Sequence, residues 1–309
     1  MKDAAPPYQL NAIFAATVVA LALTQLLVVP LVLLPQAPAL ATIAVVLIAL
    51  VTPFATAVLH EAIHNRLDRQ AARNDFIARV MAMCAGVSFD VVRFGHLSHH
   101  RFNRHALDRP DVIEPGASAF GAGAKYYFHL LGGLYVGEVF ATLAMLLPRK
   151  IVVALLKHAM SADEPEITAV RVAAIRVLER RQQQIRLDAL AVIVLYALAF
   201  SLYGAWWPLL LAGIVLRGLI ISLQDNLPHY GTPAVINAGA HNSDAPRWMT
   251  MLMLNQNYHA IHHERPDLHW NELPGVFARA GRSYTAQYFR QLLRQFNGPR
   301  RPQPSVQAE

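Results

Sequence analysis

The fold class is decided near the start of the chain, where residues 10–35 read LNAIFAATVVALALTQLLVVPLVLLP. A helix rises about 1.5 Å per residue, so this stretch can cross a hydrocarbon layer of about 30 Å. A second apolar run, residues 39–59, follows the uncharged turn at 35–38, and the two runs predict a tight transmembrane hairpin. A secretory signal peptide is the alternative, but the apolar core is too long for one and a second hydrophobic run follows at once.

Composition extends this prediction to the whole chain. Of its 309 residues, 55% are hydrophobic and only 15% are charged, which argues against a soluble protein. Residues 187–204 and 206–224 form two more apolar runs, with Trp206 and Trp207 at the turn, where they suit the far membrane interface. We therefore expect an all-α integral membrane protein with four transmembrane helices arranged as two hairpins.

Arginine-rich segments predict the orientation of these helices. Residues 60–125 carry eight arginines and are expected on the cytoplasmic side by the positive-inside rule, together with both termini. Arg217 lies within the last apolar run, close enough to its cytoplasmic end to extend to the headgroups. We expect one membrane domain over residues 1–297 and a disordered tail, rich in Pro, Arg and Gln, over residues 298–309.

The segment at residues 126–147 is ambiguous. It has the length of a span but contains His129 and Glu138. If it crossed the membrane, it would place the first and last histidine clusters on opposite sides and export the basic stretch 149–186. We therefore expect an interfacial or re-entrant helix here, followed by a charged surface helix over residues 161–186.

Three histidine clusters carry the chemistry: residues 60–64 read HEAIH, residues 96–100 read HLSHH and residues 259–263 read HAIHH. On a helix, positions i, i+3 and i+4 share one face, so each cluster can direct two or three imidazoles to one point. With 14 histidines in 309 residues, an HxxHH triplet is expected only about 0.03 times by chance. The candidate ligands are His60, His64, His96, His99, His100, His259, His262 and His263.

These imidazoles exceed the four ligands of one zinc ion but suit two metal ions with open positions. The single cysteine, Cys84, excludes a thiolate cluster and an internal disulfide. Most of the remaining histidines are scattered, and we expect them to be ordinary polar or interfacial residues. They are His105, His129, His158, His241 and His269.

The three boxes, divided by a long hydrophobic hairpin, resemble those of the membrane fatty acid desaturase superfamily of non-haem di-iron enzymes, to which hydroxylases and carotenoid ketolases are related. Residues 108–111, DRPD, resemble the acidic turn of that family. The likeness runs from the first span to Pro274 and includes the pattern around the third box, here Asn257, Tyr258, Pro266, Trp270, Leu273 and Pro274.

The resemblance implies two iron ions, with O2 as co-substrate, that remove hydrogen from an unactivated methylene of a fatty acyl chain. Desaturation is the reaction that we favour. Hydroxylation and oxidative decarboxylation to a terminal alkene are alternatives that the same boxes would serve, and the boxes do not define chain length or regiochemistry.

The resemblance also implies a ninth metal ligand, His229, in the turn DNLPH that follows the last span. A helix-capping turn is the alternative, and Asp225 or Asn226 could act through a metal-bound water. Residues 101–105 read RFNRH and depart from the Thr-Asn of many relatives. The residues expected to surround the metal ligands are Glu61, Asp108, Asp111, Asp225, Asn226 and Asn257.

The implied reaction needs two electrons for each O2, yet the chain has no flavin or dinucleotide fingerprint, cysteine cluster or recognisable haem-binding module. We therefore expect a separate electron donor, such as a ferredoxin-type carrier. The excess of 27 Lys and Arg over 20 Asp and Glu suits an acidic carrier, although anionic lipid and topology explain much of it. The other expected partners are the lipid bilayer and a fatty acyl substrate that is free, carrier-bound or part of a phospholipid; no nucleic acid is expected.

Two other classes of protein compete with this interpretation. HEAIH is also the signature of zinc metallopeptidases, in which Glu61 would be the general base. An intramembrane peptidase leaves the second and third boxes unexplained and lacks a distal Asp ligand. A metal transporter predicts polar residues within the spans, which are nearly free of them. In the oxidase, Glu61 is instead expected to accept a hydrogen bond that orients a histidine.

Overall fold

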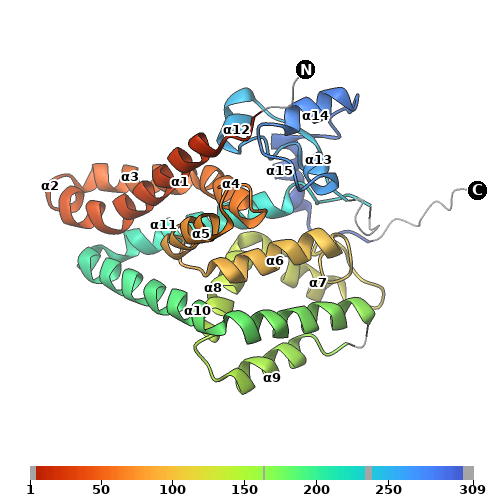
Figure 1. Ribbon diagram of the computed structural model, residues 1–309, viewed down its shortest axis with the longest axis horizontal. Coiled ribbons are helices and arrows are strands. Elements are labelled where there is room, and N and C mark those ends of the chain that lie inside the picture. The colour runs from red at the N-terminus through yellow and green to blue at the C-terminus, as the bar shows by residue number, and fades with distance from the viewer. Residues whose placement is uncertain (1–4, 163, 234–238, 302–309) are drawn as a thin grey trace, which may run out of the picture.

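The computed structural model describes residues 5–162, 164–233 and 239–301. Within these residues the chain is mostly helical, and its named strands, β1 (Ser243–Asp244) and β2 (Ala286–Gln287), form one short parallel pair. The helical class is therefore confirmed. Figure 1 shows two long helical hairpins that extend to one side and a cluster of short helices at the other end.

The two N-terminal apolar runs form the first hairpin (Figure 1). Its first arm widens into a π-helix around Pro30, because proline lacks an N–H group and clashes with the carbonyl four residues earlier. The chain turns at Ala37, and the second arm bends by 42° at Val51. The elements are α1 (Tyr8–Leu23), η1 (Thr24–Leu33), α2 (Leu34–Gln36), α3 (Pro38–Leu50) and α4 (Thr52–Ile63).

The second hairpin consists of α10 (Pro165–Tyr203), the 3-10 turn η3 (Gly204–Trp206) and α11 (Trp207–Asn226). Gly204, at the turn, has a φ of 51°, which a residue without a side chain adopts without strain. The surface helix expected at 161–186 and the third apolar run are one continuous helix. No Gly or Pro interrupts the sequence between Pro165 and Gly204, so nothing ends the helix earlier.

The far ends of the two hairpins pack on each other. Leu26 and Val45 of the first hairpin share a buried cluster with Tyr203 of the second, and the Tyr203 hydroxyl donates to the backbone oxygen of Gln25 at 2.7 Å. A Cβ atom at Gly213 would lie 2.5 Å from Nε2 of Gln25 and 2.7 Å from Cγ1 of Val45. The absence of a side chain at Gly213 therefore lets α11 approach the first hairpin closely.

By length and apolar composition, three helical segments of the described chain could cross a membrane: Tyr8–Gln36, Ala119–Ala144 and Pro165–Asn226. The bent pair Pro38–Leu50 and Thr52–Ile63 would add a fourth. The segment Pro165–Asn226 supplies both arms of the second hairpin. Two apolar hairpins are thus present, while the number of spans and their orientation remain predictions.

The segment expected to be interfacial or re-entrant is a broken helix made of α7 (Ala119–Phe128), η2 (His129–Gly133) and α8 (Leu134–Ala144). The break lies at Leu131 and Gly132, and the φ of Gly132 is 115°. The chain packs here against α11, since a Cβ atom at Gly132 would lie 3.8 Å from the backbone of the second hairpin. The positive φ at the bend is a conformation that glycine adopts without strain.

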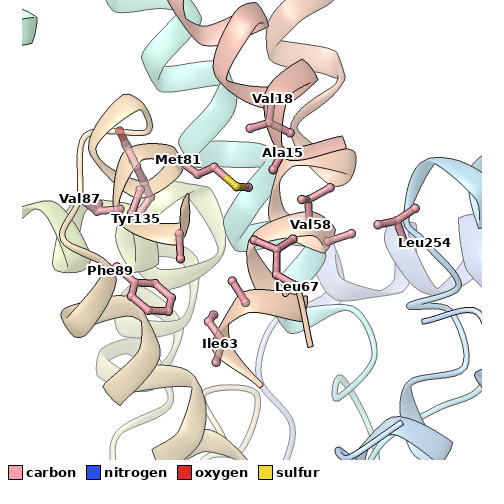
Figure 2. Packing of buried hydrophobic residues seen from close by; sticks show 14 residues of the cluster. Ala15, Val18, Val58, Ile63, Leu67, Met81, Val87, Phe89, Tyr135 and Leu254 are labelled. Atoms are coloured by element: carbon pink, nitrogen blue, oxygen red, sulfur yellow. The ribbon is translucent and has the colours of Figure 1, made fainter. Parts of the chain in front are cut away.

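A buried cluster joins the first hairpin to α5 (Ala71–Cys84) and α6 (Phe89–Phe102). Figure 2 shows Val58 and Met81 in this cluster, together with Leu254 from the C-terminal part of the chain. Because segments far apart in sequence share one core, the ends of α4 and α6 are held close to the C-terminal helices.

The C-terminal part of the described chain is a group of short helices that ends against the loop after α6. The backbone N–H of Arg300 donates to the oxygen of Asp111 at 2.7 Å, so the first residues of the expected tail are held in place. Residues 302–309 of that tail lie outside the described part. The remaining elements are α9 (Arg149–Ala159), α12 (Arg247–Leu252), α13 (His259–Glu264), α14 (Leu273–Arg279), α15 (Tyr288–Arg294) and η4 (Gln295–Asn297).

Arg217 does not extend to the headgroups as expected. Its Nη2 atom donates to the hydroxyl of Tyr196 at 2.9 Å, and its guanidinium lies 5.7 Å from the ring centre of Tyr135. Both tyrosines belong to neighbouring helices, so the side chain is directed into the protein. The prediction was wrong because a helix that is apolar on all sides does not reveal which face meets its neighbours.

Candidate metal centre

Each histidine box lies at the end of a helix. The first box closes α4, with His64 as the C-cap, the second lies in the last turns of α6, and the third forms α13. His229 follows the end of α11, where its backbone N–H donates to the oxygen of Asn226 at 3.1 Å. Four helix ends therefore present imidazoles to one region.

The nine histidines form two sets, and within each set one nitrogen per residue lies within 4.8 Å of the others. The first histidine group is His60, His64, His96, His100 and His262. The second histidine group is His99, His229, His259 and His263. The structure thus brings together every residue that we expected to bind metal.

The helical spacing explains how the boxes divide between the groups. Adjacent residues on a helix are about 100° apart, so His99 and His100 face different groups, whereas His96 and His100 share one. In the third box, the middle histidine, His262, belongs to the first group and the outer two belong to the second. The rings of His100 and His263 stack with their centres 4.2 Å apart, which places the two groups side by side.

The second histidine group has the donor set of a metal site. Its four Nε2 atoms form a closed circuit with separations of 3.1–3.3 Å. Each Nε2 carries either one proton or one lone pair, so hydrogen bonds cannot account for every contact in the circuit. Lone pairs that converge on a divalent cation would account for all of them.

The first histidine group has the same character. The Nε2 atom of His96 lies 3.0 Å from those of His64 and His100. The Nε2 atom of His60 is buried and has no hydrogen-bond partner in the described chain. An unpartnered buried nitrogen among other imidazoles fits a position that a cation would fill.

Two histidines of the second group are held in the tautomer that binds metal through Nε2. Nδ1 of His229 lies 2.6 Å from the oxygen of Gly239, and because a carbonyl only accepts, Nδ1 carries the proton. Nδ1 of His99 lies 2.7 Å from Oδ2 of Asp108 in the same way. A histidine that donates from Nδ1 keeps a lone pair on Nε2.

Burial keeps most of these imidazoles neutral. It lowers the pKa of His64 to about 4 and that of His100 to about 3, and nearby positive charge adds to the effect. Burial also lowers the pKa of His99, but the hydrogen bond and charge of Asp108 outweigh it and raise that pKa above its usual value. The residues outside the apolar hairpins whose pKa burial lowers well below normal are His96, His229, His259, His262 and His263.

The two acidic residues of the DRPD turn have different contacts. Asp108 contacts His99, as expected for a residue that orients a ligand. Asp111 instead forms a buried ion pair with Arg104 at 2.7 Å and accepts a hydrogen bond from the backbone N–H of Gly231 at 2.8 Å. Asp111 therefore holds the loop that follows His229.

In the described chain, none of the other expected surrounding residues forms a hydrogen bond with a histidine of either group, although Asp225 lies close enough to His99 for their charges to interact. Asn226 donates to Gln295 at 2.8 Å, and Asn257 donates to the backbone of Ser243 at 3.0 Å. Glu61 lies 3.8 Å from Nδ1 of His269, and Asp225 lines a cavity beside the groups. Glu61 does not orient a box histidine as we expected.

Sequence reasoning missed two amides that touch the groups. Nε2 of Gln256 lies 3.1 Å from Nδ1 of His60, and Nδ2 of Asn103 lies 3.4 Å from Nδ1 of His263. Gln256 is 196 residues from its partner, so no local pattern could reveal the contact. In the described chain, the five scattered histidines belong to neither group.

A cavity of about 1070 Å³ opens on both histidine groups. His60 and His96 of the first group line it, as does His229 of the second. Much of the remaining wall is apolar and comes from α4, α8, α10 and α11, for example Leu59, Leu134, Leu178 and Ile221. A long apolar ligand could therefore reach both groups without leaving the protein.

The fold and the site define a helical, apolar chain whose three histidine boxes, together with His229, form two groups that could each hold a metal ion. Residues 35–293 match the family model described as fatty acid desaturase, and since this is most of its length, the chain belongs to the fatty acid desaturase family. None of the curated proteins matches the chain significantly. The family acts on fatty acyl substrates in membranes, and membership implies an oxidoreductase.

Proposed function

We propose that this protein desaturates a fatty acyl chain, with two iron ions held by the nine histidines and O2 as the oxidant. The observation that carries the proposal is that both histidine groups open on one largely apolar cavity. Imidazole ligands alone suit iron and zinc equally, so iron is inferred from the family and from the need for redox chemistry.

The metal has to supply the oxidation because an unactivated methylene has no useful acidity and no side chain here could remove its hydrogen. Iron bound at the two groups would supply O2-dependent oxidation. The residues of the chain contribute position and dryness. Asp108 and Gly239 fix two imidazoles, and the apolar cavity wall holds the acyl chain beside the groups and excludes water.

The proposed reaction converts CH2–CH2 into CH=CH. One O2 accepts the two hydrogen atoms together with two further electrons and two protons, and leaves as two molecules of water. The electrons would come from a separate carrier of the ferredoxin type, which would meet the arginine-rich face around the histidine boxes. We propose that this face and both termini are cytoplasmic.

The zinc peptidase alternative is disfavoured by the same geometry. A peptidase site uses three protein ligands and one metal ion, whereas nine imidazoles converge here in two groups. Glu61, its general base, is buried beside His269 and near the backbone N–H of Trp270.

The test combines metal analysis with product analysis. Protein purified in detergent should contain two iron ions per chain, and with a ferredoxin, its reductase and O2 it should introduce a double bond into an added acyl chain. A matched reaction without O2 should give no product. One tightly bound zinc with no oxidation after reloading with iron would overturn the proposal, while an alcohol or a terminal alkene would assign the alternative reaction to the same site.

A further inference from the structure

Arg217 lies within an apolar helix and lines the same cavity as the histidine groups. It precedes Asn226, at the end of α11, by nine residues, a distance of about 14 Å along the helix axis. Ile221, Gln224 and Asp225 also line the cavity. Positions 217, 221, 224 and 225 form one helix face, so this face leads from the guanidinium to the histidines.

The guanidinium has only neutral partners in the described chain. One nitrogen, Nη2, donates to the Tyr196 hydroxyl, and the group lies over the ring of Tyr135. The Nε atom is buried and has no partner. Both tyrosine hydroxyls donate to backbone oxygens at the end of α5, those of Ala85 and Cys84, so neither tyrosine cancels the charge of the arginine.

Two other arginines with little exposed side chain are paired with carboxylates. Arg79 contacts Asp90 and Asp188 at 2.7 and 2.8 Å, and Arg104 contacts Asp111 at 2.7 Å. No described carboxylate lies within ion-pair distance of Arg217. A charged residue in an apolar segment is costly, and a ligand that restores the missing negative charge would offset that cost.

We propose that Arg217 binds the carboxylate of an unesterified fatty acid, whose hydrocarbon chain runs along the cavity to the histidine groups. The inference rests on the proposed function, in which the hydrocarbon chain is oxidised, and adds that the substrate is a free acid. A thioester or ester lacks the negative charge. A carrier or phospholipid headgroup is also too large and polar for a position so far inside an apolar hairpin.

The cavity is lined by five acidic residues, which have to be considered because a carboxylate near them would be repelled: Asp90, Asp108, Glu114, Glu138 and Asp225. Three of them have partners, since Asp90 pairs with Arg79, Glu114 with Arg109 and Asp108 with His99. Asp225 is two helical turns from Arg217, at the histidine end of the same helix face. Glu138 is one turn beyond Tyr135 on α8, and neither is within ion-pair distance of the guanidinium. None of the acidic residues that line the cavity therefore supplies a counter-charge to Arg217 within ion-pair distance.

Binding under anaerobic conditions tests the proposal without turnover. The probes are hexadecanoic acid, methyl hexadecanoate and hexadecanol, added to the full chain in phosphatidylcholine nanodiscs. Since a hydrogen bond to a charged group contributes enough to change affinity roughly 10–100-fold, wild type should prefer the acid by at least about tenfold. Arg217→Gln should bind all three within about twofold of each other, while Arg217→Lys should keep most of the preference.

Arg176→Gln is the matched control, because Arg176 is an exposed arginine outside the cavity, and it should keep the full preference. Equal binding of acid and alcohol by wild type would overturn the proposal, as would an undiminished preference in Arg217→Gln. If Arg217→Gln does not fold, the proposal is still tested by the three ligands on wild type and by Arg217→Lys. Loss of the acid preference in phosphatidylglycerol nanodiscs would mean that Arg217 binds lipid phosphate, and would also overturn the proposal.

The outcome is separable from that of the proposed function. Oxidation of acyl thioesters by a protein that shows no acid preference would remove the role of Arg217 and leave the desaturase. Arginine-dependent binding of the acid by a protein that never oxidises it would keep the role of Arg217 and remove the desaturase.

Discussion

Nδ1 of His99 lies 2.7 Å from Oδ2 of Asp108, and Nε2 of the same ring faces three other imidazoles of the second histidine group. Asp108 is nine residues after His99, beyond the end of α6, so the chain has to turn back to make the contact. The carboxylate fixes the orientation of the ring and makes its Nε2 a better electron donor.

Asp108→Asn should therefore weaken metal binding at the second histidine group by roughly 10–100-fold. An amide can still accept a hydrogen bond but cannot supply the negative charge. Competition with a chelator of known affinity measures the effect. Asp267→Asn, which removes an exposed carboxylate paired with Arg265, is the control and should bind metal as wild type does. Unchanged affinity in Asp108→Asn would mean that the contact does not support a ligand.

His262→Ala should lose the metal ion of the first histidine group and abolish activity. His262 is buried, and its Nε2 lies 3.0 Å from that of His100, so alanine removes a donor that no neighbour replaces. The matched control is His158→Ala, because His158 is exposed, lies outside the cavity and belongs to neither group. Metal content and product yield give the comparison, and full activity in His262→Ala would contradict the assignment of the site.

Gln256 offers a test of how His60 is oriented. The amide oxygen of Gln256 is buried without a partner, while its nitrogen lies 3.1 Å from Nδ1 of His60. A half-turn of the amide lets the oxygen accept a hydrogen bond from the Nδ1–H group of His60 and leaves the Nε2 lone pair free for metal.

Gln256→Glu should then retain metal at the first group, since a carboxylate also accepts from Nδ1, whereas Gln256→Leu should lower the affinity by roughly tenfold or more. The measurement is metal titration of both variants under the same conditions. Equal affinities for the two would show that Gln256 only fills space.

The sequence predicts which residues form the site better than it predicts how they are arranged. The HxxHH spacing defines a helix face, and this is a local property of α6 and α13. The division of His99 and His100 between two groups depends on how these helices meet, which is a long-range property. His229 is a lone histidine, and only the family resemblance indicated it.

The two hairpins were predictable because they too depend on a local property of the sequence. Long apolar runs are visible in the sequence, but a run that is apolar all round has no phase, so the inward direction of Arg217 could not be derived. The continuity of α10 through residues 165–203 could have been inferred, because the sequence has no helix breaker there.

Acidification should destabilise the metal-free protein between about pH 6.5 and 4. The folded state lowers the pKa of His64 from 6.5 to about 4 and that of several other box histidines also falls, so the unfolded chain binds more protons in this interval. The free energy of unfolding therefore decreases as the pH falls. His99 has a raised pKa and acts in the opposite direction, but it is one group against several.

Thermal unfolding of the metal-free protein in detergent, at about pH 7.5 and about pH 5, measures this effect. A midpoint that stays constant or rises on acidification would contradict the burial of neutral imidazoles.

Asp111→Asn should destabilise the protein through Arg104. This ion pair is almost fully buried, with 1% and 2% of the two side chains exposed, so the substitution leaves a buried guanidinium without its counter-charge. Breaking such a pair costs about 3–5 kcal/mol. The same carboxylate accepts the N–H of Gly231, two residues after His229, so the variant should also bind metal more weakly at the second histidine group than at the first. Thermal unfolding measures the loss of stability, and metal titration measures the loss of affinity. The control Asp267→Asn should show neither effect. An Asp111→Asn protein that is as stable as wild type but binds metal more weakly would show that the loop does not depend on the ion pair, and would contradict this account.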